Sequence, residues 1–242
     1  MKKIKFIFSL LVLVFLSNKS YAVDTTGEAT SYKITMTYLE LCVDGSSTAT
    51  CLSPLVVGSG DSGAIDIATT TAGAAAASYG DFSAVPFGTS YTYYQVTMKR
   101  AVTIKGSLSD GVQTCYTATD GADISKNVVG SVSAGALAEV TMYMAMTISG
   151  LGDEINSISA GDGSGTAQAA GTVDNDDEYF QYRGAFSKAI KLEPGKIPTL
   201  KLAFGTSSAL AYEGSSGGCA AAISQNQGLY GGKPDVTATV ID

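Results

Sequence analysis

An acidic run is the densest set of side chains in this sequence that could do chemistry. Asp174, Asp176, Asp177 and Glu178 fall within five consecutive residues, with Asn175 after the first of them. Calcium takes about six to eight oxygen ligands, and carboxylates clustered in a loop supply them. A loop whose charges are simply hydrated is the alternative interpretation. We therefore treat these four carboxylates as candidate calcium ligands.

Closely spaced tyrosines form a second candidate binding feature. Tyr91 and Tyr93 belong to an alternating segment in which Tyr93 is predicted to lie on the face opposite Tyr94. Exposed tyrosine rings can contact a glycan or a partner subunit, because each ring has an apolar body and a polar tip. Tyrosine is also common on ordinary sheet surfaces, so a structural role is the alternative.

Two residue types are missing, and their absence excludes whole classes of mechanism. The chain has no histidine and no tryptophan. Without imidazole there is no Ser-His-Asp or Cys-His triad and no histidine-based zinc or copper site. The Gly-Asp-Ser-Gly order at residues 60–63 is typical of serine-protease nucleophiles, but Ser62 has no imidazole base to activate it. We predict that the chain is not an enzyme.

Two further motifs have structural interpretations that we favour. Residues 58–63 satisfy the G-x-G-x-x-G pattern, but a dinucleotide site needs a helix next, whereas Ile65 and Ile67 alternate as in a strand. We interpret this segment as a Gly-rich hairpin. Met142, Met144 and Met146 place three thioethers on one strand face, a pattern that could bind Cu(I). A pliable core row is the interpretation we prefer.

Four cysteines predict two disulfide bonds. The three pairings that four cysteines allow cannot be separated by sequence alone. We favour Cys42–Cys51 with Cys115–Cys219, because the first pair brackets a short turn between two apolar segments. The chain has no C-x-x-C motif, so neither a redox centre nor a zinc knuckle is indicated.

The first residues predict a secretory signal peptide over Met1–Ala22. Basic residues precede the apolar run Phe6–Leu16, and small residues at Ser20 and Ala22 fit the cleavage pattern. That run is too short to span a bilayer, which needs about 20 residues, and no later segment is long enough. We expect a mature chain from Val23 without a transmembrane segment, in the periplasm, at the cell surface or secreted.

The net charge of the predicted mature chain limits the classes of partner that it could bind. Four of the 15 basic residues lie in the predicted signal peptide, so 11 remain against 22 acidic residues. The resulting net charge near −11 argues against nucleic acid and anionic membranes as partners. No nucleic-acid partner is therefore expected.

Alternation with a period of two residues dominates the chain. Tyr32 to Tyr38 alternates as a strand, and its phase flips at Leu39, which indicates a bulge or a strand end. The longest such segment runs from Tyr91 to Lys105, where Arg100 breaks the apolar row and predicts a bend or a crossing of a sheet edge. Further strands are predicted at Val140–Ile148, Tyr179–Arg183, Phe186–Leu192, Leu200–Phe204 and Val236–Ile241. Short helices are predicted at Ala72–Ser78 and Leu151–Ser159.

These patterns predict a mostly β fold with long loops and at most short helices. We expect an antiparallel Greek-key β-sandwich, prealbumin-like or jelly-roll-like, as one domain over residues 23–242. The Gly- and Ala-rich loop 159–171 is where a subdivision would fall.

One segment resembles a known family. Val85-Pro86-Phe87-Gly88-Thr89-Ser90-Tyr91 runs into an alternating strand, and this resembles the turn-and-strand feature of prealbumin-like (transthyretin-like) sandwich domains of exported bacterial proteins of unknown function. The opening strand Tyr32–Cys42, followed by Ile65–Ile67, resembles the start of such domains. The resemblance covers roughly residues 32–106 and implies a fold without a site. Related sandwiches serve as pilus subunits, adhesin stalks and carbohydrate-binding modules.

The function that we predict is that of an exported structural or interaction protein. It would be a pilin-like filament subunit, a cell-surface subunit or an adhesin-like domain, with itself or a cell-surface component as partner. The polar leader Val23–Ser31 could add as a strand to the open sheet edge of a neighbour. The alternative is a monomeric extracytoplasmic module that binds glycan or calcium. An enzyme using two carboxylates across a cleft is a further alternative.

Overall fold

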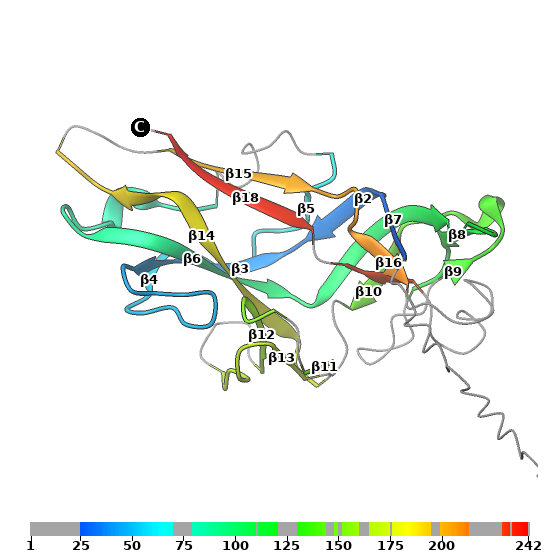
Figure 1. Cartoon of the computed structure of the whole chain (residues 1–242), viewed down its shortest axis with the longest axis horizontal. Helices are drawn as coiled ribbons and strands as arrows, with labels where there is room; N and C mark the ends of the chain where they lie inside the picture. The colour runs from blue at the N-terminus through cyan, green and yellow to red at the C-terminus, as the bar shows by residue number, and fades with distance from the viewer. Residues whose placement is uncertain are drawn as a thin grey trace, which may run out of the picture.

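The computed structural model describes residues 25–69, 79–109, 111–120, 130–143, 148–149, 152–159, 165–174, 176–194, 199–212, 229–232 and 234–241 (Figure 1). The predicted mostly β, antiparallel fold is confirmed, because every ladder between named strands is antiparallel. The helical elements of the described residues are two 3-10 turns, η2 (Phe82–Ala84) and η3 (Ala134–Ala136). None of the described segments forms a helix long and apolar enough to cross a membrane.

Two large sheets contain most of the strands. The five-stranded sheet has the order β12-β14-β6-β3-β4, and the six-stranded sheet has the order β5-β2-β7-β8-β9, with β10 also paired to β7. The strands of the first sheet are β12 (Ile155–Ile158), β14 (Tyr179–Lys191), β6 (Ser90–Lys99), β3 (Met36–Val43) and β4 (Leu55–Ser59). Those of the second are β5 (Ile65–Asp66), β2 (Ala29–Ile34), β7 (Ala101–Ser109), β8 (Thr114–Thr117), β9 (Gly130–Ser131) and β10 (Val140–Tyr143).

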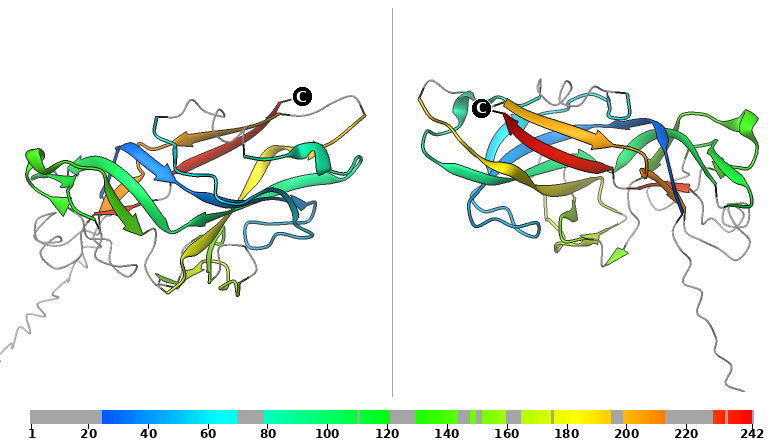
Figure 2. Two further views of the ribbon diagram at one scale, coloured as in Figure 1. Left: turned by 180° about the vertical axis from the view of Figure 1, so that it is seen from behind. Right: turned by 45° about the horizontal axis from the view of Figure 1, so that its top comes forward.

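Three smaller sheets complete the fold. The remaining strands are β1 (Thr25–Gly27), β11 (Ile148–Ser149), β13 (Thr172–Val173), β15 (Thr199–Gly205), β16 (Leu210–Tyr212), β17 (Leu229–Gly231) and β18 (Asp235–Ile241). They form a β1-β16-β17 sheet, a β11-β13 pair and a β15-β18 ribbon. The ribbon runs along β14, so apolar side chains are buried between layers as in a β-sandwich (Figures 1 and 2). A Greek-key strand order stays a prediction.

The chain passes from one large sheet to the other at two adjacent points. β2 and β3 are separated only by Thr35, and β6 and β7 only by Arg100, yet the members of each pair belong to different sheets. The two crossings are hydrogen-bonded to each other, because the Lys99 N–H donates to the Thr35 carbonyl at 3.0 Å. The crossing that the sequence predicted at Arg100 is therefore confirmed.

The predicted change of phase near Leu39 is a bulge. Opposite β6, the register shifts between Met36 and Tyr38, so the extra residue is Thr37. Before the bulge, Ile34 and Met36 face the core, and after it Leu39 does. One added residue turns the following side chains to the other face, because side chains alternate along a strand.

The N-terminal leader has partners within its own chain, which corrects the prediction of a free donor strand. β1 pairs with β16, with Gly27 opposite Leu210, and β2 continues the path beside β7. Its fit is close, since a Cβ at Gly27 would overlap Leu108, and one at Gly106 would overlap the Glu28 carbonyl. The part of the leader before Thr25 lies outside the described residues.

Two local predictions were wrong, both because tertiary pairing outweighed local pattern. The segment expected as a short helix within Leu151–Ser159 is strand β12, whose four residues are all buried beside β14. The Gly-rich segment 58–63 is no hairpin, since β4 pairs with β3 whereas β5 pairs with β2 in the other sheet. It is a connection between sheets.

Residues 165–171 of the predicted loop return to β12, where the Gln168 N–H donates to the Ser157 carbonyl at 2.8 Å.

Other predictions fall partly outside the described residues. The strand predicted from Val140 is observed as β10, with Met142 fully buried, while Met144 and Met146 are outside the described residues. The helix predicted at Ala72–Ser78 also lies outside the described residues. The two strands predicted between Tyr179 and Leu192 are one strand, β14, whose register with β6 shifts between Ala185 and Ile190.

Two buried threonines differ in how their hydroxyls are satisfied. Thr117 Oγ1 accepts from the Gly106 N–H at 3.2 Å and donates to the Ala138 carbonyl at 2.7 Å. Thr97 Oγ1 is equally buried but has no hydrogen-bond partner in the described part of the structure. A buried polar group without a partner keeps its full desolvation cost.

Replacing each threonine by valine should therefore have opposite effects. We expect Thr97→Val to raise the free energy of unfolding by about 1 kcal/mol and Thr117→Val to lower it by about 1–2 kcal/mol. Urea denaturation of the two variants beside the wild type measures both. A loss of stability in Thr97→Val would show that its hydroxyl has a partner.

Candidate functional site

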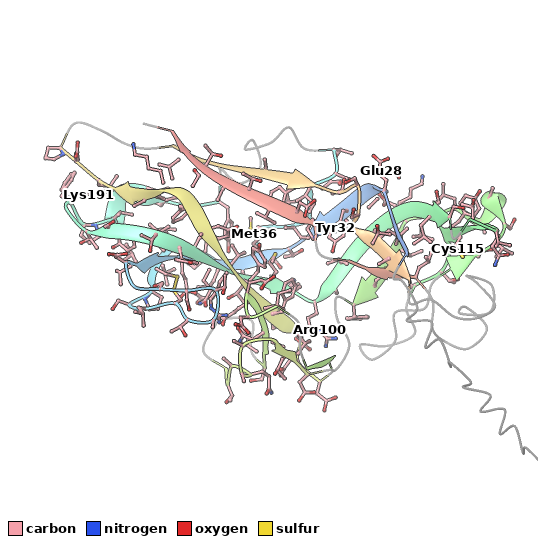
Figure 3. All side chains as sticks on the ribbon, viewed as in Figure 1. Glu28, Tyr32, Met36, Arg100, Cys115 and Lys191 are labelled. Carbon is pink, nitrogen blue, oxygen red and sulfur yellow. A yellow bond between two sulfur atoms is a disulfide. The ribbon has the colours of Figure 1, made fainter. Side chains whose placement is uncertain are left out.

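The acidic run folds around Arg100. This side chain is fully buried, at 0% exposure, and its Nη1 donates to the carbonyl oxygens of Asp174 (3.1 Å) and Asp177 (2.8 Å). The Arg100 N–H also donates to the Glu178 carbonyl at 2.8 Å. Arg100 thus lies beside the start of β14 (Figure 3), where its guanidinium and its backbone N–H together bond the carbonyls of Asp174, Asp177 and Glu178.

The carboxylates of this loop divide into internal and exposed groups. Asp177 is buried and accepts a hydrogen bond from the Ser157 hydroxyl, and that hydroxyl accepts from the Asp174 N–H at 2.8 Å. Asp174 in turn accepts from the Asp176 N–H at 3.2 Å, which closes a tight turn. Asp176 and Glu178 are exposed to solvent. The four predicted residues are therefore brought together, with Asp176 and Glu178 exposed, Asp174 half-buried and Asp177 buried.

The electrostatics of the loop combine a buried guanidinium with negative charges nearby. Burial lowers the pKa of the Arg100 guanidinium, and the negative charges of Asp177 and Asp174 oppose that shift. In the part of the chain that the structure describes, no group of three or more His, Cys, Asp or Glu side chains is placed to hold a metal ion. Asn175 is outside the described residues. The cation that the structure places in this loop is Arg100, and calcium binding by the four carboxylates stays a prediction.

A second buried arginine lies on the face of the five-stranded sheet turned away from the apolar core. Arg183 donates from Nε to Gln95 Oε1 (2.7 Å) and from Nη2 to Asn156 Oδ1 and Gln181 Oε1 (3.2 Å). Its Nη1 donates to the Thr48 carbonyl at 3.3 Å. All four acceptors are neutral, and they come from β6, β12, β14 and the loop after β3.

This network connects a disulfide-closed loop to the sheet. The predicted Cys42–Cys51 bond is present and closes the loop that carries the Thr48 carbonyl. Gln95 Nε2 donates to Glu40 at 2.6 Å, so a carboxylate lies one side chain away from Arg183. Burial lowers the pKa of Arg183, and Glu40 acts against that shift.

The structure describes only one of the two cysteines of the second predicted disulfide. Cys115 is disulfide-bonded, and it is fully buried on β8. Its predicted partner, Cys219, lies outside the described residues. No cysteine in the described chain is free.

Two carboxylates share one hydroxyl at the edge of the six-stranded sheet. Ser31 Oγ lies 2.8 Å from Asp66 Oδ2 and 3.0 Å from Glu139 Oε1, and Lys33 Nζ donates to Glu139 at 2.7 Å. Asp66 also accepts from the Tyr32 N–H at 3.0 Å. No sequence pattern marks this cluster, because its members come from three separate segments.

Hydrogen bonding lowers the pKa of both carboxyls. Burial acts to raise the pKa of Asp66, but hydrogen bonds from the Tyr32 N–H, the Ser31 hydroxyl, Ala68 and Thr69 outweigh it. The pKa of Glu139 is lowered by its hydrogen bond with Lys33 and then by Ser31. Both groups are therefore ionised and accept hydrogen bonds, which suits a connection between strands. We call this cluster of Ser31, Lys33, Asp66 and Glu139 the Asp66 clasp.

The remaining predicted groups have structural partners or lie in the interior. Tyr91 is only 3% exposed, so its ring cannot offer a surface to a glycan, whereas Tyr93 is half-buried. Ser62 Oγ accepts from the Met36 N–H at 2.9 Å and donates to the Gly63 carbonyl at 2.8 Å. It therefore helps to hold the connection between sheets. Near it, Asp61 and Lys99 form an ion pair at 2.6 Å.

No protein-family model, no curated protein and no solved structure matches this chain. The resemblance to prealbumin-like domains therefore stays a prediction.

Replacing Arg100 by methionine tests whether it organises the acidic loop. The change leaves two carbonyl groups without their donor and removes the cation beside Asp177. We expect Arg100→Met to lower the free energy of unfolding by about 3 kcal/mol, measured by urea denaturation. The adjacent Lys99→Met removes only the partly exposed pair with Asp61 and should cause a much smaller change. Equal losses in both variants would contradict the role given to Arg100.

The Asp66 clasp makes part of the stability dependent on pH. Since the folded state lowers the pKa of Asp66, its contribution is present above the ordinary aspartate pKa of about 3.9 and is lost as pH falls through the lower folded value. We expect the stability difference between wild type and Asp66→Asn to be largest near neutral pH and to shrink as pH falls below the ordinary aspartate pKa of about 3.9. Ser31→Ala, which removes one of the donors, should give an intermediate profile in chemical denaturation. Parallel profiles for all three proteins would contradict the clasp.

Proposed function

We propose that this chain is an exported, non-enzymatic structural or interaction protein, acting as a filament or cell-surface subunit or an adhesin-like domain. The observation that carries this proposal is the set of hydrogen bonds that Arg100 and Arg183 make within their own chain. Both are buried and direct their donors to groups of their own chain that are distant in sequence. Charged groups used in this way fix a shape, and they supply no reacting group to a substrate.

The disulfide chemistry supports an extracytoplasmic location. Cys42 and Cys51 are bonded to each other, and Cys115 is also in a disulfide. Such bonds persist in the periplasm, on cell surfaces and in secreted proteins, where the environment is oxidising.

Because β1 of the leader is already paired within its own chain, assembly by strand addition requires a sheet edge elsewhere in the fold. The outer edge of β4 is covered, because the Asp81 N–H donates to the Val57 carbonyl at 2.6 Å and Tyr79 lies against Gly58. The outer edge of β12 is covered by Gln168 and by the Gly171 N–H. Among the described strands, β15 pairs with β18 alone, over seven residue pairs, and lies on the outer side of the ribbon (Figure 1). We place strand addition at β15, since the backbone groups on its side away from β18 pair with no described strand and can bond an incoming one.

The alternative, a module that binds glycan or calcium, has less support. Tyr91 is buried, and the backbone of the acidic loop is bound to Arg100. A surface partner therefore fits the geometry better than either ligand.

Electron microscopy and hydrogen exchange together test this proposal. We expect residues 23–242, prepared with intact disulfides, to form ordered fibres or arrays as concentration rises. The amide hydrogens of residues 199–205 should exchange more slowly in the assembled protein than in the monomer. Single particles at every concentration would contradict a filament subunit, and new protection elsewhere without any in β15 would contradict this edge.

A matched pair of variants separates the two candidate edges. Deleting residues 23–28 removes β1 and should leave assembly intact, whereas Ala203→Pro in β15 should abolish it. Far-UV circular dichroism shows whether each variant keeps its strands. Loss of fibres in the deletion alone would return the leader to the role of donor strand.

A further inference from the structure

The edge of β15 differs from every other sheet edge in the described part of the chain. Its seven residues, Thr199–Gly205, pair with β18 on one side and with no described strand on the other. The other end strands of the described sheets are all shorter, except β18, which packs against β14. The longest of the shorter ones, β4, is covered at its outer edge. Among the described strands, β15 is therefore the only long one with an open edge.

The sequence of β15 allows a complete ladder on that open side. It contains no proline, so each of its seven residues has a backbone N–H group. Lys201 is its only charged residue. Edge strands that resist pairing carry several charges, a proline or a bulge, and β15 has one lysine alone among these features.

These facts identify the strand that a second folded copy can offer. An incoming strand also needs an open edge of its own, and in a second copy the long open edge is again that of β15. Antiparallel pairing about a two-fold axis at position 202 uses all seven residues and keeps the sheet-facing sides of both ribbons on one side. It places position 203 opposite Lys201 of the second copy, so the two lysines do not oppose each other directly.

We propose that β15 binds β15 of a second copy in this antiparallel register, which joins the two ribbons into one sheet with the order β18-β15-β15-β18. The inference rests on the proposed strand addition at β15 and names its partner. The contact uses the same edge in both copies, so it closes at a dimer. A filament then grows from dimers, through a different contact.

A charge placed at position 203 tests the partner and the register together. Ala203 pairs with the exposed Thr237, on the side of the ribbon opposite Phe204 and Val236, which face the five-stranded sheet. Position 203 meets Lys201 of the second copy twice in each dimer. We expect Ala203→Glu to lower the Kd of the dimer about fivefold and Ala203→Lys to raise it about fivefold, in analytical ultracentrifugation.

Thr237→Glu and Thr237→Lys are the matched controls. They place the same charges one strand further from the contact, about 10 Å from Lys201 of the second copy, which is roughly a Debye length in about 0.15 M salt. Their Kd values should stay within about twofold of the wild type. Far-UV circular dichroism shows that all four variants keep their strands.

The outcomes separate this inference from the proposed function. A wild-type protein that never dimerises, or equal effects of the two charges at position 203, would overturn the inference. Fibres that grow from monomers, without dependence on the sign of the charge at position 203, would overturn it and leave the filament standing. A dimer with the expected sign dependence that never forms fibres would support it and contradict the filament.

Discussion

The fold depends on a buried guanidinium at the point where two sheets exchange strands. β6 and β7 form one nearly continuous path through both large sheets, and only Arg100 separates them. A charge in that position is costly unless its hydrogen-bonding groups are satisfied. The carbonyls of Asp174 and Asp177 supply partners, and the Asp177 carboxylate supplies nearby opposite charge. The loop before β14 is thus fixed by the same group that fixes the angle between the sheets.

This dependence explains which features the sequence could predict. Strand alternation is local, so the paths of β3, β6, β7, β15 and β18 were predicted, and the break at Arg100 marked the sheet crossing. The Cys42–Cys51 pair was also local. Pairing between distant segments produces no local pattern in the sequence from which it could be predicted. β12 consists of four buried residues with mixed polarity, and only its place beside β14 makes it a strand.

The candidate site was predicted in composition but not in arrangement. Oxygen-rich residues in one loop predicted a bound cation, and calcium binding stays a prediction; the structure places Arg100 there, from the junction of β6 and β7 more than seventy positions earlier. The Ser31, Asp66 and Glu139 cluster had no sequence signal, because no two of its members are neighbours. Tyr91 and Tyr93 were grouped by alternation, yet Tyr91 is covered by other parts of the chain.

The docking of β1 has a consequence for the timing of folding. Gly27, near the start of the described chain, pairs with Leu210 on β16, so the β1-β16-β17 sheet needs nearly the whole polypeptide before it can form. Folds dominated by such distant pairings are slow to form, because chain closure precedes the gain from contacts. A chain released from its N-terminus onward would therefore keep this sheet open until its last strands emerged. Throughout that interval its unpaired strands would be available to chaperones and to other copies.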